Sequence, residues 1–347
     1  MSSDPPLDLD AFDFSLPADR IAQEPPPQRD GARLLCLARH SGAVAHTSIL
    51  DLPSQLAPGD LLVVNATRVL PARLRGRKSS GGSAEALLLG AAGPDRQRAL
   101  VRARGRQRVG QKFVFERDGR CAEAEITALE PDGAVVLAFA SDASPYELGE
   151  TPLPPYIRRA APRASDRERY QTTFARVPGS VAAPTAGLHL SEDLLAALAR
   201  RGVERAELVL HVGPGTFRPL GPEQLASRRL HAETFSLPDA TAAAIAQTRE
   251  RSGRVVAVGT TTARVLESRA RDDGRVESGS GETELFLQPG DRFRVVDALL
   301  TNFHLPRSSL LLLVAAFAGR ERVLRAYAEA IEAGYRFYSY GDAMLVQ

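Results

Sequence analysis

The sequence predicts an α/β protein into which a small antiparallel β-barrel is inserted. From about residue 180 onward, helical and strand-like hydrophobic patterns alternate, which indicates an α/β domain with largely parallel strands. Between residues 72 and 139, six short strand-like runs follow one another at roughly ten-residue spacing, which is typical of an antiparallel barrel. We therefore expect a discontinuous α/β domain over residues 1–66 and 155–347, with an Arg-rich β-barrel domain inserted over residues 67–154.

The elements of the α/β domain follow from apolar runs and their stop signals. Buried strands are expected at residues 33–38 and 61–65, and the turn Pro58–Asp60 introduces the second. Ser191 is the expected N-cap of a helix that Gly202 ends. Further strands are expected at residues 206–213, 254–259, 282–290 and 293–300. Further helices are expected at residues 239–253, 262–270, 308–319 and 322–334.

The inserted segment shows the period-two pattern of half-buried strands. Ala72 and Leu74, and likewise Phe113 and Phe115, fall on one face of their runs, with polar residues between several of them. Gly, Pro or Asp separates most runs, as expected for tight turns. The six runs cover residues 72–78, 83–89, 98–104, 111–117, 122–130 and 134–139.

The charge of the chain is unevenly distributed. The 347 residues carry a net charge of only +2, but the segment Arg68–Lys112 contains twelve Lys and Arg residues against two acids. A basic segment on an otherwise acidic body indicates a surface for a polyanion. This interpretation is favoured over a merely solvated Arg-rich face because the charges are nearly all of one sign.

Composition and the apolar runs favour a cytoplasmic protein. The longest apolar run, Leu310–Ala318, has nine residues, well short of the ~18 that a membrane span requires. The N-terminus lacks the charged-then-apolar pattern of a signal peptide. The two cysteines, Cys36 and Cys121, form no CxxC pair, which favours reduced core cysteines over a disulfide or a metal site.

Polar residues fall where strands are expected to end or helices to begin. In four segments these residues are His211, Thr260–Thr262, Asn302 with His304, and Thr185 with His189. In α/β folds this edge binds ligands, and helix N-termini there offer N–H groups to anions. Structural alternatives stay open: a lone histidine on a strand is more often a structural residue than a catalyst, and the threonines can serve only as an N-cap. The chain lacks zinc-binding, Walker and G-x-S-x-G patterns.

Several long motifs resemble one known family. From about residue 12 to the C-terminus, the chain is similar to the S-adenosylmethionine:tRNA ribosyltransferase-isomerases of queuosine biosynthesis. The motifs that carry this resemblance are AQEPPPQRDGARLL, PGDLLVVNATRVLPARL, YQTTFA, GSVAAPTAGLHL, LHVGPGTFRPL, LHAETF, VVAVGTTTARVLES, TNFHLPRSSLLLLVAAFAG and YRFYSYGDAMLV.

The resemblance implies both a fold and a reaction. The fold would be a TIM-like, incomplete-barrel α/β domain with an inserted antiparallel β-barrel. The enzyme would transfer and isomerise the ribosyl moiety of S-adenosylmethionine onto 7-aminomethyl-7-deazaguanine at the tRNA wobble position, giving epoxyqueuosine-tRNA, adenine and methionine. S-adenosylmethionine would be a substrate, with no cofactor and no metal, because the sulfonium already activates its neighbours. We expect a monomer or weak homodimer with no membrane partner.

This chemistry needs a base beside the sulfonium and an acid for the departing adenine, and His and Glu are the usual agents near neutral pH. Which residue is the base stays open. The candidate catalytic residues are His189, His211, His231, Glu233 and His304. The candidate substrate-binding residues are Thr185, Gly187, Thr260, Thr261, Arg264, Glu267, Asn302 and Asp342. The candidate tRNA-binding residues are Arg68, Arg73, Arg102, Arg104, Arg106, Arg108, Arg158 and Arg159.

The chain departs from the family pattern at a few positions. The family usually has Asp where Ala66 stands, a Phe-Thr pair at Leu190 and Ser191, and Met at Leu230. If that Asp helped to bind the sulfonium substrate, another acid must take its place. Two rival interpretations are an RNA-binding protein that has lost the chemistry and a tRNA methyltransferase. The set of His, Thr and Glu residues at the strand ends opposes the first, and the lack of an early Gly-rich strand–loop–helix opposes the second.

Overall fold

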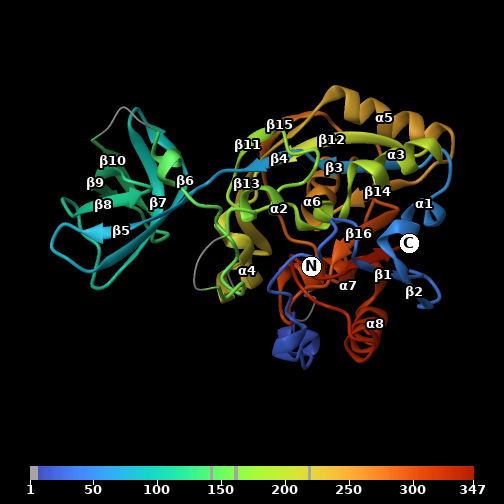
Figure 1. Cartoon of the computed structure of the whole chain (residues 1–347). Coiled ribbons are helices and arrows are strands. Elements are labelled where there is room, and N and C mark those ends of the chain that lie inside the picture. Colours follow the sequence, from blue (N-terminus) through green and yellow to red (C-terminus); the bar gives the residue numbers. More distant parts are fainter. Residues whose placement is uncertain (1–6, 141–143, 160–162, 218–219) are drawn as a thin grey trace.

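The computed structural model describes residues 7–140, 144–159, 163–217 and 220–347. They form an α/β domain and a β-barrel that lies beside it (Figure 1). The predicted fold class, an α/β domain with an inserted antiparallel β-barrel, is thereby confirmed. No helix of the described ranges is long and apolar enough to cross a membrane.

A nine-stranded mixed sheet is the centre of the α/β domain. The four central strands are parallel, and three of them, β3, β14 and β16, are buried on both faces, which explains apolar runs such as Leu61–Val64. The sheet is open at both ends. In spatial order its strands are β15 (Gly279–Leu285), β13 (Arg229–Leu237), β12 (Glu204–Leu210), β3 (Leu61–Asn65), β14 (Val255–Val258), β16 (Ala298–Asn302), β17 (Ala343–Val346), β1 (Arg33–Leu37) and β2 (Val44–Ser48).

The outer strands correct the expectation of a largely parallel sheet. β13 runs antiparallel to both β12 and β15, β17 runs antiparallel to β16, and β2 runs antiparallel to β1. β2 follows β1 through a short turn containing Gly42, and a short turn can join only antiparallel strands. Two successive helices, rather than the single crossover helix of a parallel pair, separate β16 from β17.

Helices cover both faces of the sheet. On one face, Leu194 and Leu198 pack in the same apolar cluster as Leu62 and Val64. The helices of this face are α1 (Leu52–Gln55) and α3 (Glu192–Arg200), and Ser191 caps α3 by accepting the N–H of Leu194. The helices of the other face are α5 (Asp239–Glu250), α6 (Thr260–Ser268), α7 (Ser309–Ala318) and α8 (Arg320–Glu332).

The remaining helical segments are short. Two are α-helical, α2 (Asp166–Arg169) and α4 (Pro222–Ser227), and α4 lies on the side of the α/β domain nearest the barrel (Figure 1). The 3₁₀ turns are η1 (Leu9–Phe12), η2 (Ala18–Arg20), η3 (Ile49–Asp51), η4 (Pro145–Leu148), η5 (Thr185–His189) and η6 (Pro214–Phe217).

The barrel is closed by six antiparallel strands, one for each run that the sequence predicted. Leu74, Phe113 and Phe115 are fully buried in its core, as the period-two pattern indicated. Cys121 is exposed on the barrel, so only Cys36 is the core cysteine that was expected. The strands are β5 (Arg73–Lys78), β6 (Ser83–Gly93), β7 (Arg96–Ala103), β8 (Lys112–Arg117), β9 (Arg120–Leu129) and β10 (Val135–Phe139).

A two-stranded sheet lies where the chain passes between the two bodies. β4 (Thr67–Val69) pairs in parallel with β11 (Val177–Ser180), so the segment leaving the α/β domain contacts the segment returning to it. Arg73, at the start of the barrel, exchanges backbone hydrogen bonds with Glu150. These pairings hold the segment that leaves the α/β domain next to the segment that returns to it, beside the carboxyl end of β3.

Candidate active site

The carboxyl ends of the four central strands meet at one edge of the sheet. β12, β3, β14 and β16 are parallel, so the residues that follow them lie along that edge. A cavity of about 560 Å³ opens there, within the ~300–1,000 Å³ range of small-molecule sites. Five predicted substrate-binding or catalytic residues line it: Thr185, Thr260, Thr261, Asn302 and His304.

Small side chains form one wall of this cavity. Ala182, Ala183 and Ala186 come from the segment around η5, and their small side chains line the cavity. Gly187, predicted to bind substrate, does not line the cavity. A Cβ at Gly187 would lie 2.7 Å from the Phe174 ring, so this glycine permits close packing behind the wall.

Helix α6 points its N-terminus at the cavity. Gly259, with φ +91°, joins β14 directly to α6, a backbone conformation that favours glycine. The first N–H groups of the helix have no intrahelical partner, and Thr260 and Thr261 line the cavity beside them. This arrangement suits an anionic group such as a carboxylate. Thr262 is structural, since its hydroxyl donates to the carbonyl of Val258.

Two buried histidines belong to this edge of the sheet. Burial lowers the pKa of the His304 imidazole to about 3, and its Nε2 lies 2.8 Å from the hydroxyl of Thr301. Burial, aided by the positive charges of Arg336 and Arg29, lowers the pKa of His189 to about 4. Both imidazoles are therefore neutral near pH 7. His189 does not line the cavity but reaches it through Asn302, whose Nδ2 lies 3.0 Å from its Nε2.

A second cavity of about 120 Å³ lies between the α/β domain and the barrel. It contains three more predicted residues, His231, Glu233 and Arg264, together with Arg98 and Asp132 of the barrel side. Leu310 lines both cavities, so the two adjoin.

A buried ion pair supports the smaller cavity. Arg264 donates to the Glu233 carboxylate, whose other oxygen accepts the N–H of Gly213 at 2.9 Å. Arg264 also donates from Nε to the carbonyl of Leu285 at 3.0 Å. The guanidinium of Arg264 therefore donates to protein groups, and Arg264 does not line the larger cavity.

His211 lines neither cavity. Its Nδ1 lies 2.8 Å from the hydroxyl of Thr67, and burial lowers its pKa. A Cβ on Gly179 would approach the imidazole ring to 2.6 Å, so the glycine is needed for the ring to lie there. His211 therefore links β12 to the two-stranded sheet that leads to the barrel.

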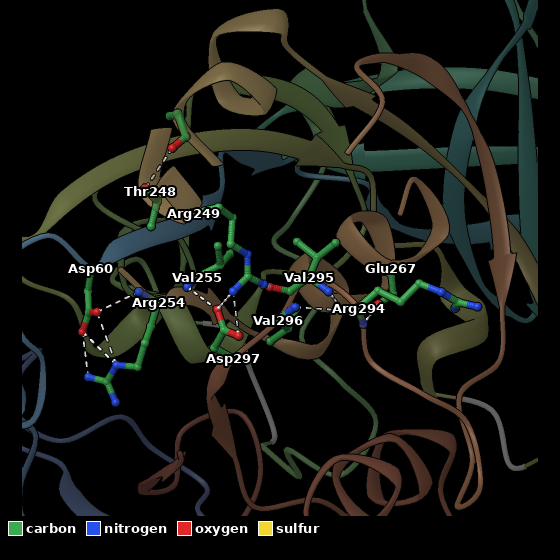
Figure 2. Close-up of polar contacts among 11 residues, drawn as sticks. Asp60, Thr248, Arg249, Arg254, Val255, Glu267, Arg294, Val295, Val296 and Asp297 are labelled. Carbon is green, nitrogen blue, oxygen red and sulfur yellow. Dashed lines mark hydrogen bonds and ion pairs between the residues drawn. The ribbon is translucent and has the colours of Figure 1, made fainter. Parts of the chain in front are cut away.

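Glu267 and Asp342 lie away from both cavities. The carboxylate of Glu267 accepts the backbone N–H groups of Arg294, Val295 and Val296 at 2.8–3.0 Å, and it fixes the segment before β16 (Figure 2). Beside it, the carboxylate of Asp297 accepts the N–H of Val255 and holds the start of β14. Asp342 is buried and accepts the N–H groups of Arg33 and Arg336. The carboxylates of Glu267 and Asp342 therefore hold backbone.

The predicted tRNA-binding arginines divide into two groups. Arg68 and Arg158 are exposed, and Arg158 stands at the rim of the larger cavity. Arg73 is held by the carbonyl of Leu153 and by Glu85, and Arg159 pairs with buried Asp166. The remaining four are exposed and, within the described ranges, form no ion pair with an acid: Arg102, Arg104, Arg106 and Arg108.

Several other arginines of the barrel are neutralised. Each of four exposed examples lies within 4.0 Å of a carboxylate, in contrast to the stretch from Arg102 to Arg108. The pairs are Arg75 with Glu150, Arg77 with Glu116, Arg117 with Asp118, and Arg120 with Glu147. Much of the positive charge that the sequence predicted is therefore unpaired around the end of β7 and in the loop that follows it.

The sequence interpretation missed several residues of the larger cavity. Tyr156, Tyr338, Ser339 and Arg307 all line it. The motif YRFYSYGDAMLV contains Tyr338 and Ser339, but neither follows the strand-end pattern used to select candidates. No Asp or Glu is among the described residues that line this cavity, so the acid expected to replace the family's Asp at Ala66 is not found there.

The sheet, the cavity at its carboxyl edge and the inserted barrel define an α/β protein with a ligand-sized cavity. Comparison with known proteins narrows the class. Residues 9–346 match the family described as queuosine biosynthesis protein. The S-adenosylmethionine:tRNA ribosyltransferase-isomerase of Anaeromyxobacter dehalogenans is 53% identical over 347 residues, covering 97% of this chain and 99% of that protein. That of Moorella thermoacetica is 48% identical over 344 residues, with coverages of 97% and 99%.

A solved structure agrees with these relatives. The crystal structure of the S-adenosylmethionine tRNA ribosyltransferase of Thermotoga maritima aligns with a TM-score of 0.57 at 38% identity, covering 97% of this chain and 100% of that one. The chain belongs to the S-adenosylmethionine:tRNA ribosyltransferase-isomerase family of queuosine biosynthesis, as its motifs predicted.

Proposed function

We propose that this enzyme transfers the ribosyl group of S-adenosylmethionine to 7-aminomethyl-7-deazaguanine at the wobble position of tRNA and isomerises it. Epoxyqueuosine-tRNA, adenine and methionine are the products. The bond from ribose to adenine and the bond from ribose to sulfur both break, whereas a methyl transfer breaks only the bond from sulfur to the methyl carbon. The substrate must therefore be reached along its whole nucleoside.

The observation that carries this proposal is the form of the larger cavity. Its volume of about 560 Å³ suits a nucleoside-sized ligand, and three alanines are among its lining residues. The N-terminus of α6 at Thr260 offers N–H groups for the methionine carboxylate. His304 presents a neutral imidazole at the cavity, which can form a hydrogen bond with the substrate.

The position of the smaller cavity supports separate binding sites for the two substrates. His231 and Glu233 lie there, between the α/β domain and the barrel, and Leu310 is common to both cavities. A nucleotide of the tRNA placed at the smaller cavity would meet S-adenosylmethionine in the larger one. The unpaired arginines around Arg104 would then contact the tRNA phosphates.

The proposal is tested by following adenine. Purified enzyme is mixed with S-adenosylmethionine and tRNA that carries 7-aminomethyl-7-deazaguanine, and free adenine is quantified by chromatography. We expect adenine and modified tRNA in equal amounts, and no adenine when the tRNA carries unmodified guanine. Binding of tRNA without adenine release would instead support an RNA-binding protein without chemistry.

A further inference from the structure

The orientation of the Asn302 side-chain amide is fixed by its neighbours. Asn302 ends β16 and is 2% exposed. Its Nδ2 lies 3.3 Å from the backbone carbonyl of Tyr338 and 3.0 Å from Nε2 of His189. A carbonyl oxygen can only accept, so the amide nitrogen must face Tyr338. His189 Nε2 is then the acceptor of the second amide hydrogen, in keeping with a neutral ring.

The other end of this amide has no partner. Asn302 Oδ1 is buried, and no donor of the described residues reaches it. The hydroxyl of Tyr338 is likewise buried without a partner in the described part of the chain. Both residues line the larger cavity. Buried polar atoms are nearly always hydrogen-bonded, so each of the two atoms calls for a missing partner: a donor for Oδ1 and an acceptor for the hydroxyl.

The backbone at Tyr338 is strained, and this conformation places its carbonyl against the Asn302 amide. Its φ is +73°, an uncommon value for a bulky residue that is held only where the surroundings impose it. The N–H of Tyr338 donates to the carbonyl of Phe303 at 3.0 Å, while its own carbonyl accepts from Asn302. The strained residue thus locks the amide against rotation, which makes it a positioning residue for Oδ1.

We propose that Asn302 Oδ1 and the Tyr338 hydroxyl bind the amino-bearing edge of the adenine of S-adenosylmethionine. Oδ1 accepts a hydrogen bond from the 6-amino group, and the hydroxyl donates to a neighbouring ring nitrogen. Burial raises the pKa of the Tyr338 hydroxyl well above its usual range, which keeps it a donor at every working pH. This assignment rests on the proposed function, in which S-adenosylmethionine is the ribosyl donor.

Adenine fits these two atoms better than the ammonium of the same substrate does. An ammonium offers donors only and leaves the hydroxyl of Tyr338 without an acceptor. Its charge also finds no Asp or Glu among the described residues of the cavity, which include Arg158 and Arg307. The rings of Tyr156 and Tyr338 both line the cavity, with their centroids 3.9 Å apart and their planes inclined by 43°, and they offer aromatic surface to a base.

The first test changes the ligand and leaves the protein intact. The dissociation constants of S-adenosylmethionine and of its analogue with hydrogen in place of the 6-amino group are measured by calorimetry on the wild-type enzyme. We expect the analogue to bind about 10- to 100-fold more weakly, because it leaves Oδ1 unpaired. Equal affinities would overturn the assignment. A loss seen only with a 2′-deoxyribose analogue would also overturn it, in favour of the ribose.

The second test changes the protein. In Asn302→Leu the preference for the 6-amino group should fall to less than about 3-fold. Tyr338→Phe should weaken both ligands equally and keep the preference. Tyr156→Phe is the matched control, since its hydroxyl is already bound to Ser339. A full preference in Asn302→Leu would overturn the assignment, and if that variant does not fold, the ligand comparison decides alone.

The experiments distinguish a failure of the adenine-site assignment from a failure of the proposed reaction. Ribosyl transfer to tRNA is measured on the wild-type enzyme in parallel with the binding series. Transfer without a preference for the 6-amino group contradicts only the adenine site. Absence of transfer, in an enzyme that binds S-adenosylmethionine with that preference, contradicts only the proposed reaction.

Discussion

Arg264 donates to the carboxylate of Glu233, and each of the two side chains is only 6% exposed. The pair connects α6, which begins at the larger cavity, with β13, which carries His231 into the smaller one. A charge left alone at such depth is expensive, whereas an exposed pair contributes little. We therefore expect that breaking the pair lowers the stability of the protein and also disturbs the smaller cavity, which both residues line.

Arg264→Ala is expected to lower the free energy of unfolding by about 3–5 kcal/mol, because it leaves Glu233 buried and uncompensated. Urea unfolding measures the change. The matched control is Arg229→Ala, which breaks an exposed pair with Glu284 and is expected to lose less than about 1 kcal/mol. Similar losses in the two variants would contradict the structural role of the buried pair.

Glu267→Ala is expected to destabilise the protein by about 3 kcal/mol, because three backbone N–H groups lose their charged acceptor. The affinity for S-adenosylmethionine should change less than about 2-fold in the folded variant, since Glu267 lines neither cavity. Urea unfolding and calorimetry provide the two readouts. Glu250→Ala, in the last turn of α5, is the control. A stable variant that binds the substrate poorly would restore Glu267 as a binding residue.

His304 makes the protein sensitive to acid. Its pKa is about 3 when folded against 6.5 for the free side chain, so the unfolded chain takes up this proton first as the pH falls. Stability is thus present above pH 6.5 and is lost as the pH falls towards 3. At pH 5 the loss from this residue should be about 2 kcal/mol relative to pH 7.

The acid sensitivity is measured by urea unfolding at pH 7 and pH 5. In His304→Gln the difference between the two pH values should shrink by about 2 kcal/mol. Thr301→Val removes the hydrogen-bond partner without removing a titratable group, so it should keep the full difference. An unchanged pH dependence in His304→Gln would show that the imidazole is not held neutral by burial.

Joint replacement of Arg102, Arg104, Arg106 and Arg108 by Ala is expected to weaken tRNA binding and to flatten its salt dependence. The slope of log K against log salt should fall by about 0.7–0.9 for each phosphate that is no longer neutralised by an arginine. Affinity for S-adenosylmethionine should hardly change. Binding titrations at several salt concentrations provide the measurement.

The matched control removes the same number of charges from the same barrel. It replaces the four arginines that already pair with acids: Arg75, Arg77, Arg117 and Arg120. Because the change in net charge is equal, a larger effect of the first set identifies direct contacts rather than long-range attraction. Equal slopes in the two variants would make the unpaired arginines only a solvated face.

Local patterns predicted the fold well where the signals are strong. All six barrel strands and the helix from Ser191 to Gly202 could be read from alternation, N-caps and glycine stops. Strands β13 and β17 could not be predicted from such patterns. β17 has only four residues, and β13 carries charged residues such as Arg229 and Glu233 along a strand near the sheet edge. Strand direction at the edges depends on connections that no single run encodes.

The candidate site was predictable only where sequence position implies a shared edge. Thr260, Asn302 and His304 come together because parallel strands end on one side of the sheet. Glu267 stands near the far end of α6, and its backbone partners lie 27–29 residues away, beyond any local pattern. Tyr338 reaches the cavity because its backbone is left-handed, and a tyrosine in the sequence gives no sign of that conformation.

The central claim is that ribose, and not methyl, passes from S-adenosylmethionine to tRNA. The most direct measurement uses S-adenosylmethionine carrying one radiolabel in the ribose and a different one in the methyl group, incubated with tRNA that carries 7-aminomethyl-7-deazaguanine. We predict that the ribose label becomes bound to the tRNA and that the methyl label leaves with methionine. Methyl label in the tRNA, with the ribose label left in the nucleoside product, would contradict the account and indicate a methyltransferase.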